Sequence, residues 1–259
     1  VLVLIAVLAP LVYLNFLRDA EMSPEEFLDA GGDNGNGPVV AVLGASTVHG
    51  IGSADFVSVL RQRMGGDGYQ FVNAGINGDT SADLLERADE IAAVKPDAVA
   101  VLVGSNNVRS IDTLEPALGD YRRDLGELAR TLTDRTGTDL AFYSLQPLGE
   151  DLDDAGNERV TAFNGAIADV ARKYDAAYLP LGETLADTIR SRGGSTPSGF
   201  SFAAAATAGF EHYYLGRGWN EIGESNGYTV LIDGLHLNDR GAKTAADLGE
   251  DWLREVDPG

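Results

Sequence analysis

The chain has 259 residues, of which 44% are hydrophobic and 23% are charged. This size and composition suit one globular α/β domain with a substantial core. Forty acidic residues against 19 basic ones give a net charge of -21 without a basic stripe, so we expect no nucleic-acid partner. The absence of cysteine excludes disulfides and thiolate metal sites.

Residues 1–17 (VLVLIAVLAPLVYLNFL) are almost wholly apolar and carry no charged side chain. The run is slightly shorter than the roughly 20 residues with which a helix spans a bilayer. We favour an anchor or signal segment, with a juxtamembrane stretch up to residue 28, and no clear cleavage site follows it. Such a segment predicts a protein that is membrane-anchored on the extracytoplasmic side, or secreted. The alternative is a buried core helix in a cytoplasmic protein.

A Gly- and Asn-rich stretch at residues 29–38 (DAGGDNGNGP) predicts a linker, so we expect the folded domain to cover residues 39–259. Short apolar runs then predict strands that are buried on both faces of a parallel sheet. These runs, of which the last is the weakest, lie at residues 39–44, 71–75, 97–104, 139–147 and 176–181.

Three amphipathic helices are expected between these strands, each with apolar residues recurring at helical spacing. The first begins at Thr80, which with Asp83 offers a capping box, and the others lie within residues 115–135 and 160–174. Alternating strands and helices predict a three-layer α/β/α sandwich with a mainly parallel five-stranded sheet. Ligands of such sheets bind beyond the carboxyl ends of the strands.

The alternation stops at residues 191–230, which are rich in Gly, Ser and aromatic residues. Because this stretch directly precedes a segment with a candidate carboxylate and imidazole, it could form a lid or part of a substrate wall. The alternative is a surface excursion that packs on its own aromatic side chains.

Ser46 follows the first predicted strand within residues 43–50 (LGASTVHG), and we expect the next helix to begin near Ser53 or Ala54. Small neighbours would let a substrate approach its hydroxyl, although Gly and Ser are also common in turns. Val48 excludes the G-x-S-x-G nucleophile elbow. The glycine spacing also excludes the dinucleotide and P-loop motifs.

The next two predicted strands are followed by groups that can donate hydrogen bonds to a negatively charged oxygen. Gly75 and Gly78 lie in the turn after the second strand, where backbone N–H groups are available. Asn106 and Asn107 follow the third strand and carry side-chain amides. Each motif alone is equally typical of ordinary turns.

Asp233 and His236 stand three residues apart in the segment DGLHLND at residues 233–239, before the last helix. A carboxylate at this spacing can orient an imidazole within a turn. The chain has only three histidines, so few general bases are available. We prefer His236 to His49, because no acid is placed to orient His49.

In their order and spacing these four segments resemble the SGNH hydrolases, also called the GDSL esterase/lipase family, over residues 38–255. The resemblance implies a flavodoxin-like fold with Ser46 as nucleophile and His236 as general base, oriented by Asp233. It also implies an oxyanion hole made by the backbone N–H groups of Ser46 and Gly78 and the side chain of Asn106. Two positions depart from the family pattern, because Ala45 and Asn107 each stand where the family usually has Asp.

The activity that the resemblance implies is serine-dependent hydrolysis of carboxylic esters, with no metal or organic cofactor. Its substrate would be a lipid, an acylated sugar or a small ester. Two alternatives remain at this stage. One is an O-acyltransferase that passes the acyl group to a sugar hydroxyl, and the other is an inactive module that binds a glycan or lipid.

Overall fold

The computed structural model describes residues 13–14, 18–35, 37–111, 113–193 and 199–258. Within these residues one sheet has the strand order β2-β1-β3-β4-β5, and each neighbouring pair is parallel. The predicted parallel sheet is therefore confirmed, including its weakest strand. The strands are β1 (Val39–Gly44), β2 (Gln70–Gly75), β3 (Ala98–Leu102), β4 (Asp139–Tyr143) and β5 (Ala177–Leu179).

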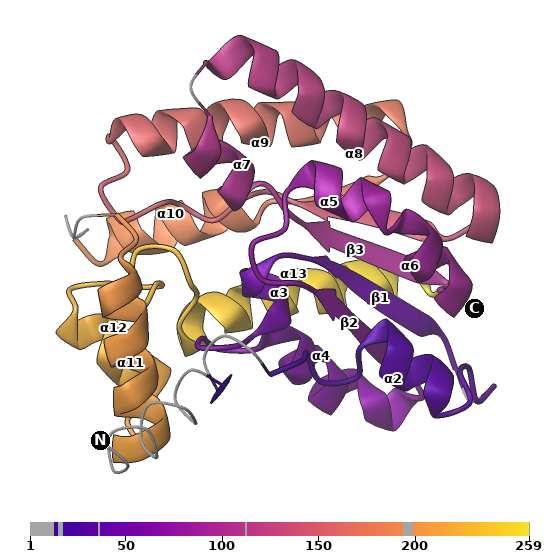
Figure 1. The fold of residues 1–259 in the computed structure, drawn as a ribbon, viewed down its shortest axis with the longest axis horizontal. Coiled ribbons are helices and arrows are strands. Elements are labelled where there is room, and N and C mark those ends of the chain that lie inside the picture. The colour runs from indigo at the N-terminus through magenta and orange to yellow at the C-terminus, as the bar shows by residue number, and fades with distance from the viewer. Residues whose placement is uncertain (1–12, 15–17, 36, 112, 194–198, 259) are drawn as a thin grey trace.

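Helices cover both faces of this sheet, as Figure 1 shows, and make the expected three layers. On one face the long helix α8 packs against α5, α6 and α9, and on the other α13 packs against α4 and α10. The predicted capping box is present, because Thr80 and Asp83 exchange hydrogen bonds at the start of α5. The helices of these layers are α4 (Phe56–Met64), α5 (Ser81–Glu86), α6 (Ala88–Val94), α8 (Leu114–Thr136), α9 (Ala155–Lys173), α10 (Leu181–Ser191) and α13 (Asp239–Val256).

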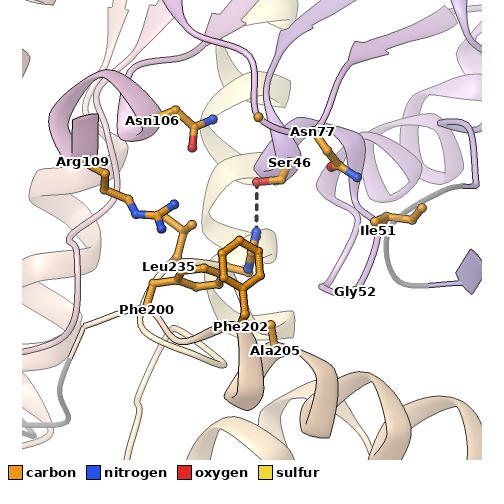
Figure 2. Close-up of a pocket in the computed structure, with 12 residues that line it drawn as sticks. Ser46, Ile51, Gly52, Asn77, Asn106, Arg109, Phe200, Phe202, Ala205 and Leu235 are labelled. Carbon is orange, nitrogen blue, oxygen red and sulfur yellow. Dashed lines mark hydrogen bonds between the residues drawn. The ribbon is translucent and has the colours of Figure 1, made fainter. Parts of the chain in front are cut away.

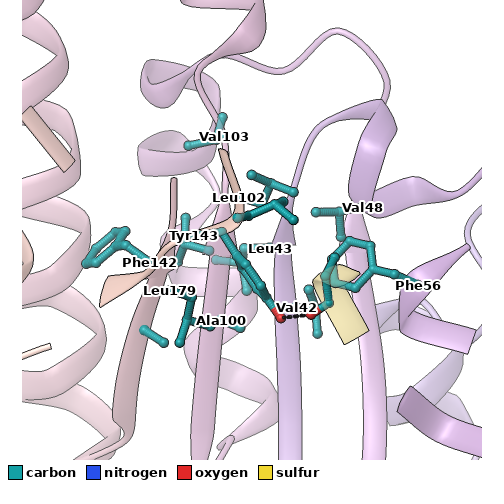
Figure 3. Packing of buried hydrophobic residues seen from close by; sticks show 14 of the residues in the cluster. Val42, Leu43, Val48, Phe56, Ala100, Leu102, Val103, Phe142, Tyr143 and Leu179 are labelled. Carbon is teal, nitrogen blue, oxygen red and sulfur yellow. Dashed lines mark hydrogen bonds between the residues drawn. The ribbon is translucent and has the colours of Figure 1, made fainter. Parts of the chain in front are cut away.

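The core lies where the apolar faces of the helices meet the sheet. All six residues of β1 are buried, which explains why its sequence is hydrophobic without alternation. Figure 3 shows Phe56 of α4 reaching Tyr143 of β4, with ring centroids 5.7 Å apart in an edge-on arrangement. The hydroxyl of buried Tyr143 donates to the backbone oxygen of Ala245 at 3.0 Å, so this ring also anchors α13.

The packed unit begins earlier than the expected boundary at residue 39. Helix α2 (Pro24–Asp29) lies against β2 and α6, and its Phe27 is only 5% exposed. The Gly-rich stretch that was expected to be a linker is itself tied down, because Asp33 accepts a hydrogen bond from Gln70 at 2.8 Å. The prediction missed α2 because a single buried aromatic in six residues makes too short a pattern.

Most of the predicted membrane segment lies outside the described residues, which include only Tyr13 and Leu14 of residues 1–17. None of the helices in the described part of the chain is both long enough and apolar enough to cross a membrane. The membrane anchor and the location that follows from it stay predictions.

Five further elements complete the described fold, and two of them belong to the stretch at residues 191–230. There α11 and α12 lie side by side and α12 also contacts α13 (Figure 1). These elements are α3 (Ser46–His49), η2 (Gly65–Asp67), α7 (Ser105–Ser110), α11 (Phe202–Leu215) and α12 (Trp219–Ser225).

Candidate active site

The carboxyl ends of three neighbouring strands bring the sequence motifs together. Gly44 at the end of β1 stands in register with Gly75 of β2 and Leu102 of β3. The segments that follow these three residues carry Ser46, Gly78 and Asn106, and all three side chains or backbones line one pocket. The predicted grouping of distant loops at one edge of the sheet is therefore present.

Ser46 is the first residue of α3, a short helix that was not expected, and the next helix begins only at Phe56. The close packing of α3 on the sheet depends on Gly44. A Cβ at that position would come within 2.4 Å of the Val48 side chain and 2.2 Å of the backbone oxygen of Leu102. The glycine thus lets the helix begin immediately beyond β1, with the Ser46 side chain half-buried in the pocket.

Two hydrogen-bond contacts link the side chains of Ser46, His236 and Asp233. The Nε2 atom of His236 lies 2.9 Å from the Ser46 Oγ, as Figure 2 shows with a dashed line. The Nδ1 atom of the same ring lies 2.7 Å from Oδ2 of Asp233. Because an ionised carboxylate can only accept, Nδ1 carries the proton in this contact and Nε2 is left as the acceptor for the serine hydroxyl.

The carboxylate of Asp233 is 1% exposed and is compensated by three donors. Besides the His236 ring, the backbone N–H groups of Leu235 and His236 donate to its Oδ1 at 3.0 and 2.9 Å. Burial acts to raise the pKa of Asp233, but the charge of His236 and these hydrogen bonds outweigh it, and the pKa lies below its ordinary value. Asp233 therefore stays ionised at neutral pH.

Gly78 and Asn106 line the same pocket as Ser46, and Figure 2 shows the Asn106 side chain extending towards Ser46. Gly78 has a φ of +90°, a conformation that favours glycine, and a Cβ there would meet nothing within 4 Å. The Asn106 amide donates to the backbone oxygen of Asp79 at 2.9 Å, which fixes the plane of the amide beside the Gly78 turn. A carboxamide has two N–H groups, so one remains for another acceptor.

Asn107, which departs from the family pattern, is hydrogen-bonded to Ser81, just after the turn that contains Gly78. Its Oδ1 accepts from the Ser81 N–H at 3.1 Å, and its Nδ2 donates to the Ser81 hydroxyl at 3.0 Å. That hydroxyl in turn donates to buried Asp124 at 2.8 Å. An amide can both accept and donate, whereas an ionised carboxylate cannot, so this arrangement depends on asparagine.

Arg87 also stabilises the turn that contains Gly78 and Asp79. Its Nε lies 2.9 Å from Asp79 Oδ2, and its Nη2 donates to the backbone oxygen of Ala74 at 2.6 Å. Burial raises the pKa of Asp79, and the neighbouring guanidinium offsets that rise only in part. Arg87 thereby links the end of β2 to the residue whose carbonyl orients Asn106.

Two buried polar residues that the sequence did not single out hold the Asp233–His236 segment in place. Gln146 is fully buried beyond β4, and its Nε2 donates to the Thr47 hydroxyl at 2.9 Å and to the backbone oxygen of Leu235 at 3.2 Å. These partners adjoin Ser46 and His236 in the sequence, so one side chain joins the two segments that carry Ser46 and His236.

Glu150 is the second such residue and is 2% exposed. Its Oε1 accepts from the backbone N–H groups of Thr229, Val230 and Leu231 at 2.8 to 3.1 Å. A buried carboxylate is tolerated when it is hydrogen-bonded in this way, and here it fixes the backbone that leads to Asp233. The sequence offered no signal for either residue beyond a polar side chain within or shortly after the apolar run at residues 139–147.

The stretch at residues 191–230 contributes to the pocket at its beginning and packs on itself farther on. Phe200, Phe202 and Ala205 line the pocket, and the Phe200 ring stands edge-on to His236 with centroids 5.6 Å apart. By contrast, His212 stacks on Trp219 with ring centroids 3.9 Å apart. The self-packing interpretation thus describes the later part of this stretch, and a role of its first part as a substrate wall stays a prediction.

His49 does not take the place of His236. Its ring is 8% exposed, and its Nδ1 has no hydrogen-bond partner among the described residues. Burial, together with the positive charge of Arg18, lowers the pKa of His49.

The described part of the chain also contains no group of three acidic or imidazole side chains that could hold a metal ion.

Comparison with known proteins agrees with this geometry. The model of the GDSL-like Lipase/Acylhydrolase family matches residues 42–244, a range that contains all the site residues described above. The chain belongs to this family. It is therefore an enzyme that hydrolyses ester bonds, and the resemblance seen in the sequence is confirmed. No curated protein matches the sequence.

Solved structures share the fold at low sequence identity. An acetyl xylan esterase superposes with a TM-score of 0.62 at 15% identity, covering 83% of this chain and 99% of its own. A GDSL-like lipase from Bacteroides thetaiotaomicron gives 0.60 at 14% identity, with coverage of 90% and 98%. A lipase/acylhydrolase from Enterococcus faecalis gives 0.58 at 15% identity, with coverage of 85% and 96%.

The bridge made by Gln146 yields a prediction. Gln146→Met keeps the length of the side chain but removes the donor to Thr47 and Leu235, leaving the Leu235 carbonyl buried without its partner. We expect kcat to fall by about 10- to 100-fold, because small displacements of reacting groups are costly. We also expect a loss of about 1–3 kcal/mol in unfolding free energy.

Steady-state kinetics on an aryl ester and denaturant unfolding measure these two quantities. Gln62→Met, at an exposed position of α4, is the matched control. Wild-type kcat in Gln146→Met would contradict the assigned positioning role.

Proposed function

We propose that this enzyme is a serine esterase that removes a short acyl group from a small alcohol or a carbohydrate hydroxyl, through an acyl-enzyme on Ser46. The observation that carries the proposal is the continuous contact from the Ser46 Oγ through the His236 ring to Asp233, at 2.9 and 2.7 Å. A hydroxyl, an imidazole and a carboxylate in this order form the arrangement that activates a serine nucleophile.

In the first step the Ser46 Oγ attacks the ester carbonyl while His236 Nε2 accepts the hydroxyl proton. Asp233 holds the ring in the required tautomer and stabilises the imidazolium that forms. His236 then donates that proton to the departing alkoxide as the bond between the acyl carbon and the alcohol oxygen breaks. In the second step water attacks the acyl carbon while His236 Nε2 accepts a proton from it. His236 then returns this proton to the Ser46 Oγ as the bond between the acyl carbon and that oxygen breaks, and the carboxylic acid leaves.

The negative charge that develops on the carbonyl oxygen needs donors on the opposite side of the pocket. We assign this role to the backbone N–H groups of Ser46 and Gly78 and to the second N–H of the Asn106 amide. Ser46 opens α3, where the first backbone N–H groups have no partner within the helix. One such donor is worth roughly 3–4 kcal/mol of transition-state stabilisation.

The dimensions of the pocket favour a small acyl group. Its volume is about 270 Å³, near the lower end of the range for small-molecule sites. Aromatic side chains stand at its mouth, and Phe202 is 71% exposed, as is suitable for packing against a sugar ring or an aryl group. Two structural neighbours are acetyl xylan esterases, which supports the same substrate class for this chain.

Replacing the nucleophile tests the proposal. Ser46→Ala should lower kcat/KM on 4-nitrophenyl acetate by roughly 10⁴-fold or more, because no other group forms the acyl-enzyme. Circular dichroism and thermal unfolding should show an intact fold. Ser58→Ala, on α4, is the matched control and should retain activity. Wild-type turnover by Ser46→Ala would end the proposal.

Removing the amide of Asn106 tests the assignment of the oxyanion donors. Asn106→Ala should lower kcat by roughly 100-fold or more while KM changes little, since the donor acts mainly on the charge of the transition state. Full kinetics on the same ester separate the two parameters. A rise in KM with unchanged kcat would instead assign Asn106 to ground-state binding.

A further inference from the structure

Among the described residues, Arg109 is the one cationic side chain that lines the pocket containing Ser46 and His236. The other described residues that line the pocket supply uncharged polar groups and apolar walls, which include Ile51 and Leu235, and none of them carries a carboxylate. This is unexpected in a chain with 40 acidic residues and a net charge of -21. Arg109, the permanently charged side chain among the described residues of the pocket, therefore has a sign opposite to the net charge of the protein.

Arg109 also differs from other arginines of the chain in its partners. Arg87 pairs with Asp79 at 2.9 Å and Arg217 with Glu211 at 2.6 Å, and most other arginines form similar pairs. No carboxylate of the residues that the structure describes pairs with Arg109. Its described contact is with the Phe200 ring, whose centroid lies 4.5 Å from the guanidinium carbon.

The Arg109 side chain donates no hydrogen bond to a described residue, so its contact with the Phe200 ring leaves its N–H groups without an acceptor there. A cation above an aromatic ring is bound through the face of the ring, whereas the five N–H groups of arginine lie in the guanidinium plane. The edge of the guanidinium thus stays available for a planar oxyanion. Figure 2 shows the Arg109 side chain extending from α7 towards the same space that Ser46 and Asn106 face.

The position of Arg109 on α7 sets its distance from the reacting carbonyl. Asn106 and Arg109 are three residues apart on this helix, so they share one face with Cβ atoms roughly 5–6 Å apart. If Asn106 donates to the carbonyl oxygen, then Arg109 meets a group a few bonds away on the same substrate.

We propose, on the basis of the function proposed above, that the pocket selects esters that carry an anionic substituent, a carboxylate or a phosphate, and that Arg109 binds it. A guanidinium matches the geometry of both groups. The net charge of the chain does not oppose this binding at short range, because salt screens charges beyond about 8 Å at physiological ionic strength. Arg109 is thus a specificity-determining residue.

Three aryl acetates that differ in one meta substituent test this selectivity: 3-acetoxybenzoate, 3-acetoxyphenyl phosphate and the neutral 3-acetoxybenzamide. The measured quantity is kcat/KM for each anionic ester divided by kcat/KM for the amide. Comparing this ratio between wild type and a variant cancels the intrinsic reactivity of each leaving group. In Arg109→Gln we expect the ratio to fall about 5- to 10-fold for at least one anionic ester.

Two further variants separate charge from packing. Arg109→Lys keeps the positive charge and should retain part of the preference. Arg130→Gln removes an equal charge from an exposed position of α8 and should leave the ratio unchanged. If Arg109 only supported Phe200, Arg109→Gln would slow all three esters equally and the ratio would stay at its wild-type value, which would overturn the inference.

The same experiment distinguishes this inference from the proposed function. If wild type hydrolyses none of the three esters in a Ser46-dependent manner, then the proposed function fails. If it hydrolyses them all without Arg109-dependent preference, only the inference fails. A ratio that falls for one anion alone supports the inference and identifies its substituent as carboxylate or phosphate.

Discussion

The buried carboxylate of Asp233 is the group on which the arrangement of the site depends. A charge removed from water is tolerated only when hydrogen bonds replace its hydration. Asp233 obtains three of them from within its own turn, two from backbone N–H groups and one from the His236 ring. The same bonds that compensate the charge therefore fix the conformation of the turn and the tautomer of the imidazole that contacts Ser46.

The hydrogen bonds of Asp233 orient the His236 ring, but the ring contacts Ser46 only if the fold also holds the segments of Ser46 and His236 at a fixed separation. The parallel sheet supplies the coarse alignment, because its carboxyl ends place the loops after β1, β2 and β3 along one edge. Buried polar side chains supply the fine alignment. Gln146 joins the loops of Ser46 and His236, and Glu150 fixes the backbone that precedes Asp233. The polar partners of both Gln146 and Glu150 lie on segments remote in sequence. The hydrogen bonds that align the site therefore also hold distant parts of the fold together.

The sequence predicted the features that arise from local patterns. Continuous apolar runs located the strands, and Thr80 with Asp83 marked the start of a helix. It failed where the pattern was short or the interaction long-range. Helix α3 is a single turn, and α2 has one buried aromatic as its main signal. The roles of Gln146 and Glu150 are set by partners more than 75 residues away, which no local pattern reveals.

The central claim is that Ser46 is the nucleophile activated by His236, and covalent labelling tests it most directly. A fluorophosphonate probe reacts with a serine only when a neighbouring base activates it. Peptide mapping by mass spectrometry should place the adduct on Ser46 in wild type, and His236→Ala should label far more slowly. An adduct on another serine, or equal labelling of Ser46 without His236, would contradict the account.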